Sequence, residues 1–398
     1  MKTTSSVHDI DSEKPPFGSR FLTNEHEVWS QNAWDHVPPP DDQVEVIAAS
    51  LLKQRLARVP DDDKPKYNDK PSRHWDNFYK TNSSNFFRNR KWLHNEFPEL
   101  VAGTQSEAGP MSIAEIGCGA GNSVFPLLEA NRNPNLTLRA YDYSTHAVKL
   151  VQNNPLYLSP PAGTIQASVW DVTSADGLPP NMEPESTDIV ILVFVISALH
   201  PNEWRRAISN VHKMLKPGGL VMFRDYGRHD LTQLRFKSGR LLDENFYIRG
   251  DKTRVYFFEL DELALLFTGS KVSPDQKLET ELINDDDERE CESEVQWSPP
   301  DDQPVLASEE DPSATDHPLS TPLELGLNGS PLPDSESLRP NLTSIMCIHP
   351  NLLTSPPGSL PHPLFKVEQL GVDRRLLVNR KRQLKMYRVW MQGKFQKV

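Results

Sequence analysis

Hydrophobic residues recur along this chain with two different spacings. Short apolar runs at 113–116, 136–141, 164–169, 188–195 and 219–224 predict β-strands, and helical periodicity at 121–130, 144–153 and 202–215 separates most of them. Strands that alternate with helices favour a parallel sheet. Two further runs, 366–372 and 384–395, predict the last strands. We therefore expect an α/β fold with a Rossmann-like, mostly parallel seven-stranded sheet.

Segments outside this alternation define the domain organisation. Residues 1–16 are predicted to be a disordered leader, and 17–100 an N-terminal extension facing RNA and cofactor, with helices at 42–58 and 70–100. Residues 233–258 interrupt the alternation and predict a hairpin with its turn at 249–252, followed by a helix at 259–268. Residues 272–363 are acidic, rich in Pro and Ser and without periodicity, so we expect a disordered insertion. The insertion divides the core into 101–271 and 364–398.

The charge balance follows the same division. The net charge is −12, but residues 272–363 hold 19 Asp and Glu against 3 Lys and Arg. The remainder keeps 40 basic against 36 acidic residues, and 366–398 alone holds 10 against 2. A mildly basic body with a basic end is compatible with a polyanionic partner.

Cysteine content and hydropathy exclude several classes of protein. The three cysteines, Cys118, Cys291 and Cys347, have no metal-ligand spacing, which argues against a zinc site or a disulfide framework. No apolar run reaches the length of a membrane span, and the first residues carry no signal or transit pattern. We expect no metal, no membrane association and a cytoplasmic location, with the nucleus as the alternative.

A glycine-rich turn carries the most specific chemistry. It follows the strand at 113–116, contains Gly117 and Gly119, and opens a helix. Glycines in such a turn let the backbone approach a nucleoside, and an acid after the next strand, here Asp142, accepts from ribose hydroxyls. Asp171, after the third strand, is expected to face the adenine amino group. The G-x-G-x-G spacing resembles motif I of class I S-adenosylmethionine-dependent methyltransferases, so we expect that fold and cofactor. The structural alternative is a tight turn that binds nothing.

Polar residues follow the fourth and fifth predicted strands, at the edge where open α/β sheets bind ligands. His200 is interpreted as a base, a substrate contact or a residue at the start of a helix. Arg224 and Asp225 end the fifth strand, and an ion pair that only joins loops is the structural alternative. Methyl transfer to a ring nitrogen with a free lone pair needs no base, whereas a carboxylate near the ring favours the cationic transition state. Asp225 is therefore the leading catalytic candidate.

Two stretches combine aromatic and basic residues. Trp75 and Tyr79 lie four residues apart on one predicted helix face, which suggests a lid over the cofactor, with a core stripe as the alternative. In the predicted hairpin, basic residues alternate with Phe and Tyr rings, an arrangement that suits phosphates and stacked bases. A merely solvated hairpin is the alternative. The candidate RNA contacts there are Arg235, Lys237, Arg249, Lys252 and Arg254.

Several motifs together resemble the eukaryotic tRNA N3-methylcytidine methyltransferases. The resemblance rests on the runs that begin at Phe17, Asn32, Trp75, Glu115, Ile196, Phe223, Glu244, Val372 and Tyr387. It covers nearly all of the chain except 1–16 and 272–363. It implies methylation of N3 of cytidine 32 in the tRNA anticodon loop. The N-terminal and Asp-Arg-Arg runs resemble the branch that acts on threonine tRNAs, in some organisms also on arginine tRNAs.

The resemblance also implies site residues and partners. The implied cofactor contacts are Trp75, Tyr79, Gly117, Asp142, Asp171, Val172 and Val193, and the C-terminal runs add Arg374, Arg375 and Arg388 as RNA contacts. The expected partners are the tRNA anticodon stem-loop and an aminoacyl-tRNA synthetase or another tRNA-binding protein.

Two other functions stay open from the sequence. The first is a small-molecule methyltransferase, against which the basic hairpin and tail argue. The second is a non-catalytic scaffold or cytoskeletal adaptor using the acidic insertion, against which the intact glycines and acids argue.

Overall fold

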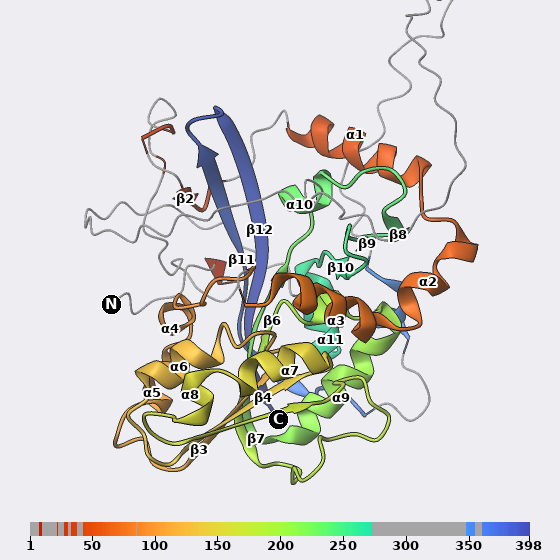
Figure 1. Cartoon of the computed structure of the whole chain (residues 1–398). Coiled ribbons are helices and arrows are strands. Elements are labelled where there is room, and N and C mark those ends of the chain that lie inside the picture. Colours follow the sequence, from red (N-terminus) through yellow and green to blue (C-terminus); the bar gives the residue numbers. More distant parts are fainter. Residues whose placement is uncertain are drawn as a thin grey trace, which may run out of the picture. The chain divides into compact units, whose positions relative to one another are not determined.

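The computed structural model describes residues 8–9, 22, 28–30, 33–37, 43–84, 86–272, 348–354 and 360–398 (Figure 1). Its α-helices are α1 (Gln43–Leu56), α2 (Pro65–Asn68), α3 (Pro71–Asn82), α4 (Leu93–Glu96), α5 (Pro98–Gly103), α6 (Val124–Ala130), α7 (Thr145–Gln152), α8 (Pro155–Leu158), α9 (Trp204–Met214), α10 (Leu231–Leu234), α11 (Leu260–Thr268) and α12 (Pro350–Leu353). Short 3-10 helices are η2 (Asp61–Asp63), η3 (Ile196–Ala198) and η4 (Pro201–Glu203). The strands are β1 (His8–Asp9), β2 (Ala33–Asp35), β3 (Met111–Ile116), β4 (Leu136–Asp142), β5 (Thr164–Val169), β6 (Thr187–Val193), β7 (Leu215–Tyr226), β8 (Leu241–Asp243), β9 (Phe246–Ile248), β10 (Arg254–Tyr256), β11 (Phe365–Asn379) and β12 (Leu384–Lys397).

The larger sheet confirms the predicted α/β fold. Strands β5, β4, β3, β6 and β7 lie side by side and parallel, and the antiparallel hairpin β11–β12 joins them along β7. Two short strands, β1 and β2, pair with β11 in addition to the seven expected strands. Since β1 lies within 1–16, the prediction of a disordered leader is wrong for His8 and Asp9. The rest of that segment lies outside the described residues.

Alternating side chains bury both faces of this sheet. Along β6, Ile189, Ile191 and Val193 pack on one face, and Val190 and Leu192 pack on the other. Helices α4 to α7 cover the first face, and α9 and α11 cover the second. A strand buried on both faces is apolar throughout, as is typical of a parallel sheet. The carboxyl ends of the five parallel strands therefore meet at one edge, where a doubly wound sheet binds its ligand.

The chain before β3 differs from its prediction. The single helix expected at 70–100 is wrong, because three helices, α3, α4 and α5, replace it. α3 stops where Ser83 adopts a left-handed φ of 51°. The following segment runs to the glycine-rich turn, where the Arg90 N–H donates to the Asn122 carbonyl at 2.7 Å. Pro98 begins α5 instead of ending a helix, as its missing N–H allows.

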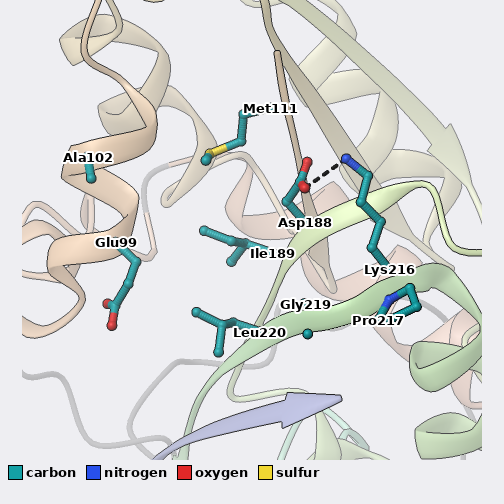
Figure 2. A pocket seen from close by; sticks show the side chains of 10 residues that line it. Glu99, Ala102, Met111, Asp188, Ile189, Lys216, Pro217, Gly219 and Leu220 are labelled. Carbon is teal, nitrogen blue, oxygen red and sulfur yellow. Dashed lines mark hydrogen bonds and ion pairs between the residues drawn. The ribbon is translucent and has the colours of Figure 1, made fainter. Parts of the chain in front are cut away.

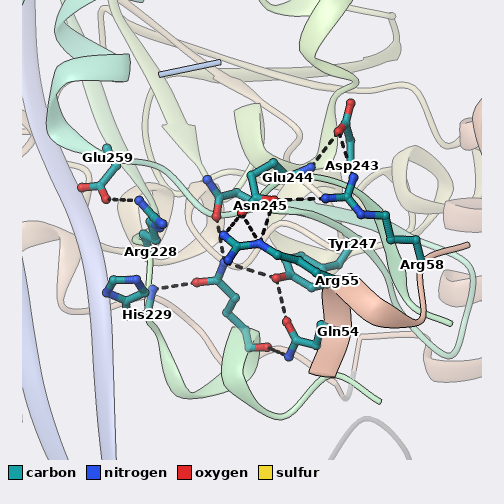
Figure 3. A network of polar contacts seen from close by, with 11 residues as sticks. Gln54, Arg55, Arg58, Arg228, His229, Asp243, Glu244, Asn245, Tyr247 and Glu259 are labelled. Carbon is teal, nitrogen blue, oxygen red and sulfur yellow. Dashed lines mark hydrogen bonds and ion pairs between the residues drawn. The ribbon is translucent and has the colours of Figure 1, made fainter. Parts of the chain in front are cut away.

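Helix α1 confirms the helix expected at 42–58 and packs against a second, smaller sheet. This antiparallel sheet, β8–β9–β10, extends the expected hairpin by one strand and places its β9–β10 turn as predicted. Polar side chains join helix and sheet, as Figure 3 shows: the Tyr247 hydroxyl donates to the Gln54 side chain at 2.8 Å, and Arg55 pairs with Glu244. These contacts hold the N-terminal helix against the basic hairpin.

The expected insertion is shorter than predicted at its carboxyl end. Residues 273–347 and 355–359 lie outside the described residues, whereas 348–354 contain helix α12. Leu352 is buried in the core, and the His349 N–H donates to the Glu262 carboxylate at 2.9 Å. The prediction of disorder is therefore wrong for 348–354. The Pro-rich and Ser-rich composition around this segment gives no sign of the short packed helix that it contains.

The β11–β12 hairpin continues past the end of its neighbour. Trp390 on β12 pairs with Tyr226, the last residue of β7, and the hairpin goes on to a tip that includes Arg380, Lys381 and Arg382 (Figure 1). All three tip side chains are exposed. At about 3.3 Å per residue, the tip lies roughly 20 Å beyond the carboxyl end of β7. The hairpin therefore presents basic groups well away from the sheet edge.

Candidate active site

The glycine-rich turn between β3 and α6 bends sharply under α3. Gly117 and Gly119 have φ values of 66° and 54°, in the left-handed region that favours glycine. A Cβ on Gly119 would lie 2.3 Å from the hydroxyl oxygen of Tyr79. Glycine is needed because this side chain lies directly over the turn. The structure thus brings Tyr79 to the turn, as expected for a lid.

Asp142, at the end of β4, lies beside the same turn. Its carboxylate accepts from the N–H of Gly119 at 2.9 Å and from the N–H of Ser144 at 2.8 Å. The side chain is buried, and burial raises the pKa of Asp142 to about 6. Each carboxylate oxygen has a further lone pair, so Asp142 can also accept from two ribose hydroxyls.

Asp171 and Tyr143 complete the polar edge of the site. Asp171 is exposed and accepts from the N–H and the hydroxyl of Thr173, at 2.8 and 2.7 Å. Burial raises the pKa of Tyr143 well above its usual value, and the charges of Asp142 and Asp171 raise it further. The Tyr143 hydroxyl has no hydrogen-bond partner within the described part of the chain. An unpartnered buried hydroxyl beside two acids fits a polar ligand such as the S-adenosyl group.

Glu115 supports the glycine-rich turn and the start of α6. It is buried in β3 and accepts from the Val124 N–H at 3.1 Å, at the start of α6. Burial raises the pKa of Glu115 to about 7, although the Arg90 guanidinium, 3.6 Å away, acts in the opposite direction. Arg90 also donates to the Ser123 hydroxyl at 3.1 Å. These contacts fix the segment after α3 against the glycine-rich turn.

Helix α3 is anchored over the site by a carboxylate. Asp76 accepts from the Ser144 hydroxyl at 2.7 Å and from the His146 N–H at 3.1 Å, both at the start of α7. On the same helix the rings of Trp75 and Tyr79 stack with centroids 6.0 Å apart. The two remaining expected cofactor contacts, Val172 and Val193, are buried just after β5 and at the end of β6.

Comparisons with known proteins agree with this geometry. A family model described as a methyltransferase domain matches residues 114–221. A tRNA N(3)-methylcytidine methyltransferase of Schizosaccharomyces pombe is 38% identical over 397 residues, which cover 100% of this chain and 97% of the relative. This chain belongs to the tRNA N(3)-methylcytidine methyltransferase family. It is accordingly an S-adenosylmethionine-dependent methyltransferase.

Other relatives show how far the similarity extends. A tRNA(Thr) (cytosine(32)-N(3))-methyltransferase of Saccharomyces cerevisiae is 49% identical over 274 residues, which are 67% of this chain and 43% of that relative. The chain thus spans less than half the length of that protein. A tRNA N(3)-cytidine methyltransferase of Danio rerio is 37% identical over 295 residues, 67% of this chain and 82% of the relative. Among solved structures, an S-adenosylmethionine-dependent methyltransferase of Methanosarcina mazei has a TM-score of 0.39 and 14% identity, covering 76% of this chain and 98% of its own.

In this methyltransferase His200 starts a helix. Its Nδ1 accepts from the Asn202 N–H at 3.2 Å, and its own N–H donates to the Glu203 carboxylate at 2.6 Å, so it caps η4. Burial lowers the pKa of His200 to about 4, which keeps the ring neutral near pH 7. Of the three roles that the sequence left open, the geometry favours the structural one over a catalytic base.

Asp225 is fully buried at the end of β7. Its carboxylate accepts from the N–H of Ser197 and from the N–H of Tyr226, each at 2.9 Å. Burial raises the pKa of Asp225 to about 6. Because Asp225 has no exposed surface, whereas Asp142 keeps 6%, the expectation that this carboxylate meets the base directly has no support in the geometry. Asp225 instead positions η3 against the end of β7.

The structure gives Arg224 a role in the fold, and its catalytic assignment has no support in the geometry. Its guanidinium is buried, pairs with Asp373 and lies between the rings of Trp92 and Trp390, 4.8 and 5.0 Å from their centroids. It also donates to the side chain of Gln392. The sequence offered an ion pair between loops as the structural alternative, whereas this ion pair joins the strands β7, β11 and β12.

The predicted RNA contacts differ in how far they are buried. Arg254 pairs with Glu203 at 3.2 Å and Arg388 with Asp230 at 2.8 Å, and their side chains are only 2% and 12% exposed. Arg375 pairs with carboxylates on β2 and β11. Arg254, Arg375 and Arg388 each have a role in the fold, because carboxylates within the protein pair with their charges, and RNA contact at these residues stays a prediction. The exposed members are Arg235, Lys237, Lys252 and Arg374, and Arg249 is half-buried.

A hollow of about 320 Å³ lies at the opposite edge of the sheet, away from the glycine-rich turn (Figure 2). It is lined by α5 and by the amino ends of β3, β6 and β7. Asp188 in its wall is already occupied, since it pairs with Lys216 at 2.7 Å and accepts from the Ser112 N–H at 2.8 Å.

Among the described residues no group of three or more His, Cys, Asp or Glu side chains could hold a metal ion, and no helix there is long and apolar enough to cross a membrane.

Three side chains at the carboxyl edge are absent from the site residues predicted from the sequence. Arg90 lies at the glycine-rich turn, Phe194 follows β6, and Tyr226 ends β7. Phe194 has a left-handed φ of 60°. Each lies in a run that the sequence marks as functional, Tyr226 as one of three polar side chains that end the fifth strand, but only the folded geometry shows which side chains they meet.

Proposed function

We propose that this chain transfers the methyl group of S-adenosylmethionine to N3 of cytidine 32 in the anticodon loop of threonine tRNAs, with arginine tRNAs as a second substrate set. The S. cerevisiae relative is named for that tRNA and that position. The observation that carries the proposal is the intact cofactor cradle, with Gly119 under Tyr79 and bound to Asp142, in a chain related over its full length to a tRNA methyltransferase.

The reaction needs positioning more than acid–base catalysis. N3 of a neutral cytosine carries a free lone pair, so it can attack a methyl group without prior deprotonation. The bound cofactor supplies that methyl group on a positively charged sulfonium. His200 and Asp225 are occupied by backbone partners, which is consistent with a site that has no general base. Holding the nitrogen and the methyl group in line supplies the acceleration.

Exposed basic groups near the carboxyl edge and on the hairpin that extends beyond it suit the RNA backbone. Lys252 lies on the β9–β10 turn, and Arg380, Lys381 and Arg382 lie at the tip of the β11–β12 hairpin. Their positive charges would release counterions from phosphates on binding. The base itself must leave the loop to present N3, because stacking hides the Watson–Crick edge. We propose that the hairpin tip contacts phosphates remote from the methylated base.

We further propose a second protein partner, an aminoacyl-tRNA synthetase or another tRNA-binding protein. The support is the negative charge of residues 272–363, which repels RNA and suits a basic protein surface.

We propose the cytoplasm, or the nucleus, as the location, because the low cysteine content suits a reducing compartment.

Radiolabelled methyl transfer tests the substrate class. The purified chain is incubated with labelled S-adenosylmethionine and a threonine tRNA transcript, and with the same transcript carrying uridine 32. Uracil N3 bears a proton and lacks the free lone pair, so we expect label only in the cytidine 32 transcript. Equal labelling of both transcripts, or of neither, contradicts the proposed function.

A further inference from the structure

Two aromatic rings meet at the carboxyl ends of β6 and β7. The ring centroids of Phe194 and Tyr226 are 4.7 Å apart, with the planes tilted by 41°. Both residues are half-buried. Phe194 directly precedes Val195, which lies against the glycine-rich turn: a Cβ on Gly117 would be 2.6 Å from the Cγ2 of Val195. The ring pair therefore lies next to the cofactor cradle, at the edge where the acceptor nitrogen must arrive.

The backbone of Phe194 is held in a conformation that bulky residues rarely adopt. Its φ is 60°, in the left-handed region. Its N–H donates to the Arg224 carbonyl at 2.8 Å, so the neighbouring strand fixes this conformation. Backbone strain of this kind is concentrated at ligand-binding and catalytic sites. The strain turns the chain out of β6 at the point where the aromatic pair forms.

Guanidinium groups flank the two rings. Arg90 lies 5.7 Å from the centroid of the Phe194 ring, and Arg249 lies 5.5 Å from that of Tyr226. Arg90 already faces Glu115 at 3.6 Å. Within the described part of the chain Arg249 forms no ion pair, and its guanidinium donates only to a carbonyl at 3.2 Å and a hydroxyl at 3.5 Å of the following residues. Burial raises the pKa of the nearby Asp225 carboxyl and the charge of Arg249 acts in the opposite direction, but no carboxylate in the described part of the chain pairs with the guanidinium, so it can still bind an anion.

We propose that the target cytosine stacks on the Phe194–Tyr226 ring pair while Arg249 binds a phosphate of the same nucleotide. This inference rests on the proposed function and names the residues that receive the base. A base drawn out of an RNA loop loses its stacking neighbours, and aromatic side chains replace them. A guanidinium binds phosphate through two parallel hydrogen bonds, which fixes the displaced nucleotide in one orientation.

The chemistry of the reaction distinguishes the two roles. The cytosine ring gains positive charge as N3 takes the methyl group. The face of an aromatic ring attracts a cation more strongly than a neutral base, so Phe194 and Tyr226 favour the transition state. A guanidinium on the base itself would oppose that charge, so the phosphate is the partner that fits Arg249. The rings should act on turnover, and Arg249 on the affinity for tRNA.

Steady-state kinetics of the full-length chain on the threonine tRNA transcript separate these roles. Tyr226→Leu and Phe194→Leu should each lower kcat, and with it kcat/KM, by about tenfold to hundredfold, the range for losing one base–ring stack. Tyr226→Phe keeps the ring and should stay within about threefold of wild type. Arg249→Gln should raise KM for tRNA about tenfold while kcat stays near wild type.

Arg132→Gln is the charge-matched control. Arg132 is exposed, donates only to backbone carbonyls and lies between α6 and β4, at the opposite edge of the sheet. Its kinetics should equal wild type. Calorimetric binding of S-adenosylmethionine reports whether each variant is folded.

Normal kcat/KM in both leucine variants, with normal cofactor binding, overturns the inference and leaves the proposed function standing. A wild type that does not methylate cytidine 32 overturns the proposed function and the inference with it. If the leucine variants lose cofactor binding, a second measurement tests the inference. The wild-type protein is bound to tRNA that carries a fluorescent cytosine analogue at position 32, and the fluorescence of the analogue is recorded. Quenching supports the stack, and unquenched fluorescence overturns it.

Discussion

The cofactor side and the hairpin side of the larger sheet obtain their key side chains in different ways. On the cofactor side, Gly119 and its partner Asp142 are 23 residues apart, within one continuous run of strands and turns. On the hairpin side, Arg224 and Asp373 are 149 residues apart, and their ion pair joins strands from the two separated parts of the core. The first arrangement is local in the chain and the second exists only after folding.

This difference shows which charges serve the fold and which are free for a ligand. The cofactor side uses backbone N–H groups and a buried carboxylate, whose oxygens keep lone pairs for a nucleoside. The hairpin side is rich in arginine, yet Arg224 and Arg388 are paired with carboxylates and stack on Trp390. The RNA contact that we propose falls to exposed groups such as Arg380 and Lys381 at the hairpin tip. Burial and partners, more than charge density, decide the role of each arginine.

The largest effect is expected from Asp142→Ala on the cofactor side. It removes the acceptor for the ribose hydroxyls and a hydrogen bond that holds Gly119. Losing two charge-assisted hydrogen bonds should weaken S-adenosylmethionine binding by at least about hundredfold, measured by calorimetry. Asp176→Ala removes an exposed carboxylate from the turn after β5 and serves as the control. Equal affinities of the two variants would show that Asp142 is not a cofactor ligand.

On the hairpin side, Asp373→Ala should act on stability. It leaves Arg224 as an uncompensated buried charge, which costs about 3–5 kcal/mol. Glu368→Ala on the same strand breaks an exposed pair with Lys366 and should cost about 0–1 kcal/mol. Urea unfolding of the three proteins measures both values. A loss below about 1 kcal/mol for Asp373→Ala would mean that this network does not hold the two parts of the core together.

Neutralising the hairpin tip should act on RNA alone. The triple variant Arg380→Gln, Lys381→Gln, Arg382→Gln should weaken tRNA binding and lower the slope of log affinity against log salt by about 2–3, one unit or slightly less per lost phosphate contact. The charge-matched control removes Arg132, Lys149 and Arg206, which are exposed elsewhere on the core. Filter binding across salt concentrations gives both slopes. The same slope in both variants would place the RNA elsewhere.

The smallest effect concerns pH and Glu262, a buried acid that belongs to neither the cofactor side nor the hairpin side. Burial raises the pKa of Glu262 to about 7, whereas an unfolded glutamate titrates near about 4.3. Between these values the folded state binds more protons than the unfolded state, so the free energy of unfolding falls as pH rises from about 5 to about 8. Glu262→Gln should flatten this dependence in urea titrations. It should not remove it, because Glu115 has a pKa raised in the same direction. An unchanged slope would refute the titration of Glu262 in this range.

The sequence predicts the cofactor side well because its determinants are short-range. Strand length, a glycine spacing and an acid after the next strand are all present in a single stretch, and the structure brings Gly119, Tyr79 and Asp142 together. The helix expected at 70–100 was wrong for a tertiary reason, since contacts with the glycine-rich turn override the periodicity of that segment.

The hairpin side was predicted less well because a sequence shows charge without showing its partner. Arg254 and Arg388 carry the charge expected of RNA contacts, but their carboxylates lie 51 and 158 residues away. Asp225 likewise ends its strand where predicted, and only the fold shows that Ser197 and Tyr226 occupy it. Such pairs depend on how separate segments pack, which no local pattern encodes.

Mass spectrometry of nuclease fragments tests the central claim most directly. A threonine tRNA transcript is incubated with the purified chain and S-adenosylmethionine, digested, and compared with the same reaction using Asp142→Ala. We predict one added methyl group, as N3-methylcytidine, on the fragment that carries position 32, and none with the variant. A methyl group on another fragment, or no methyl group on the RNA at all, would contradict the account.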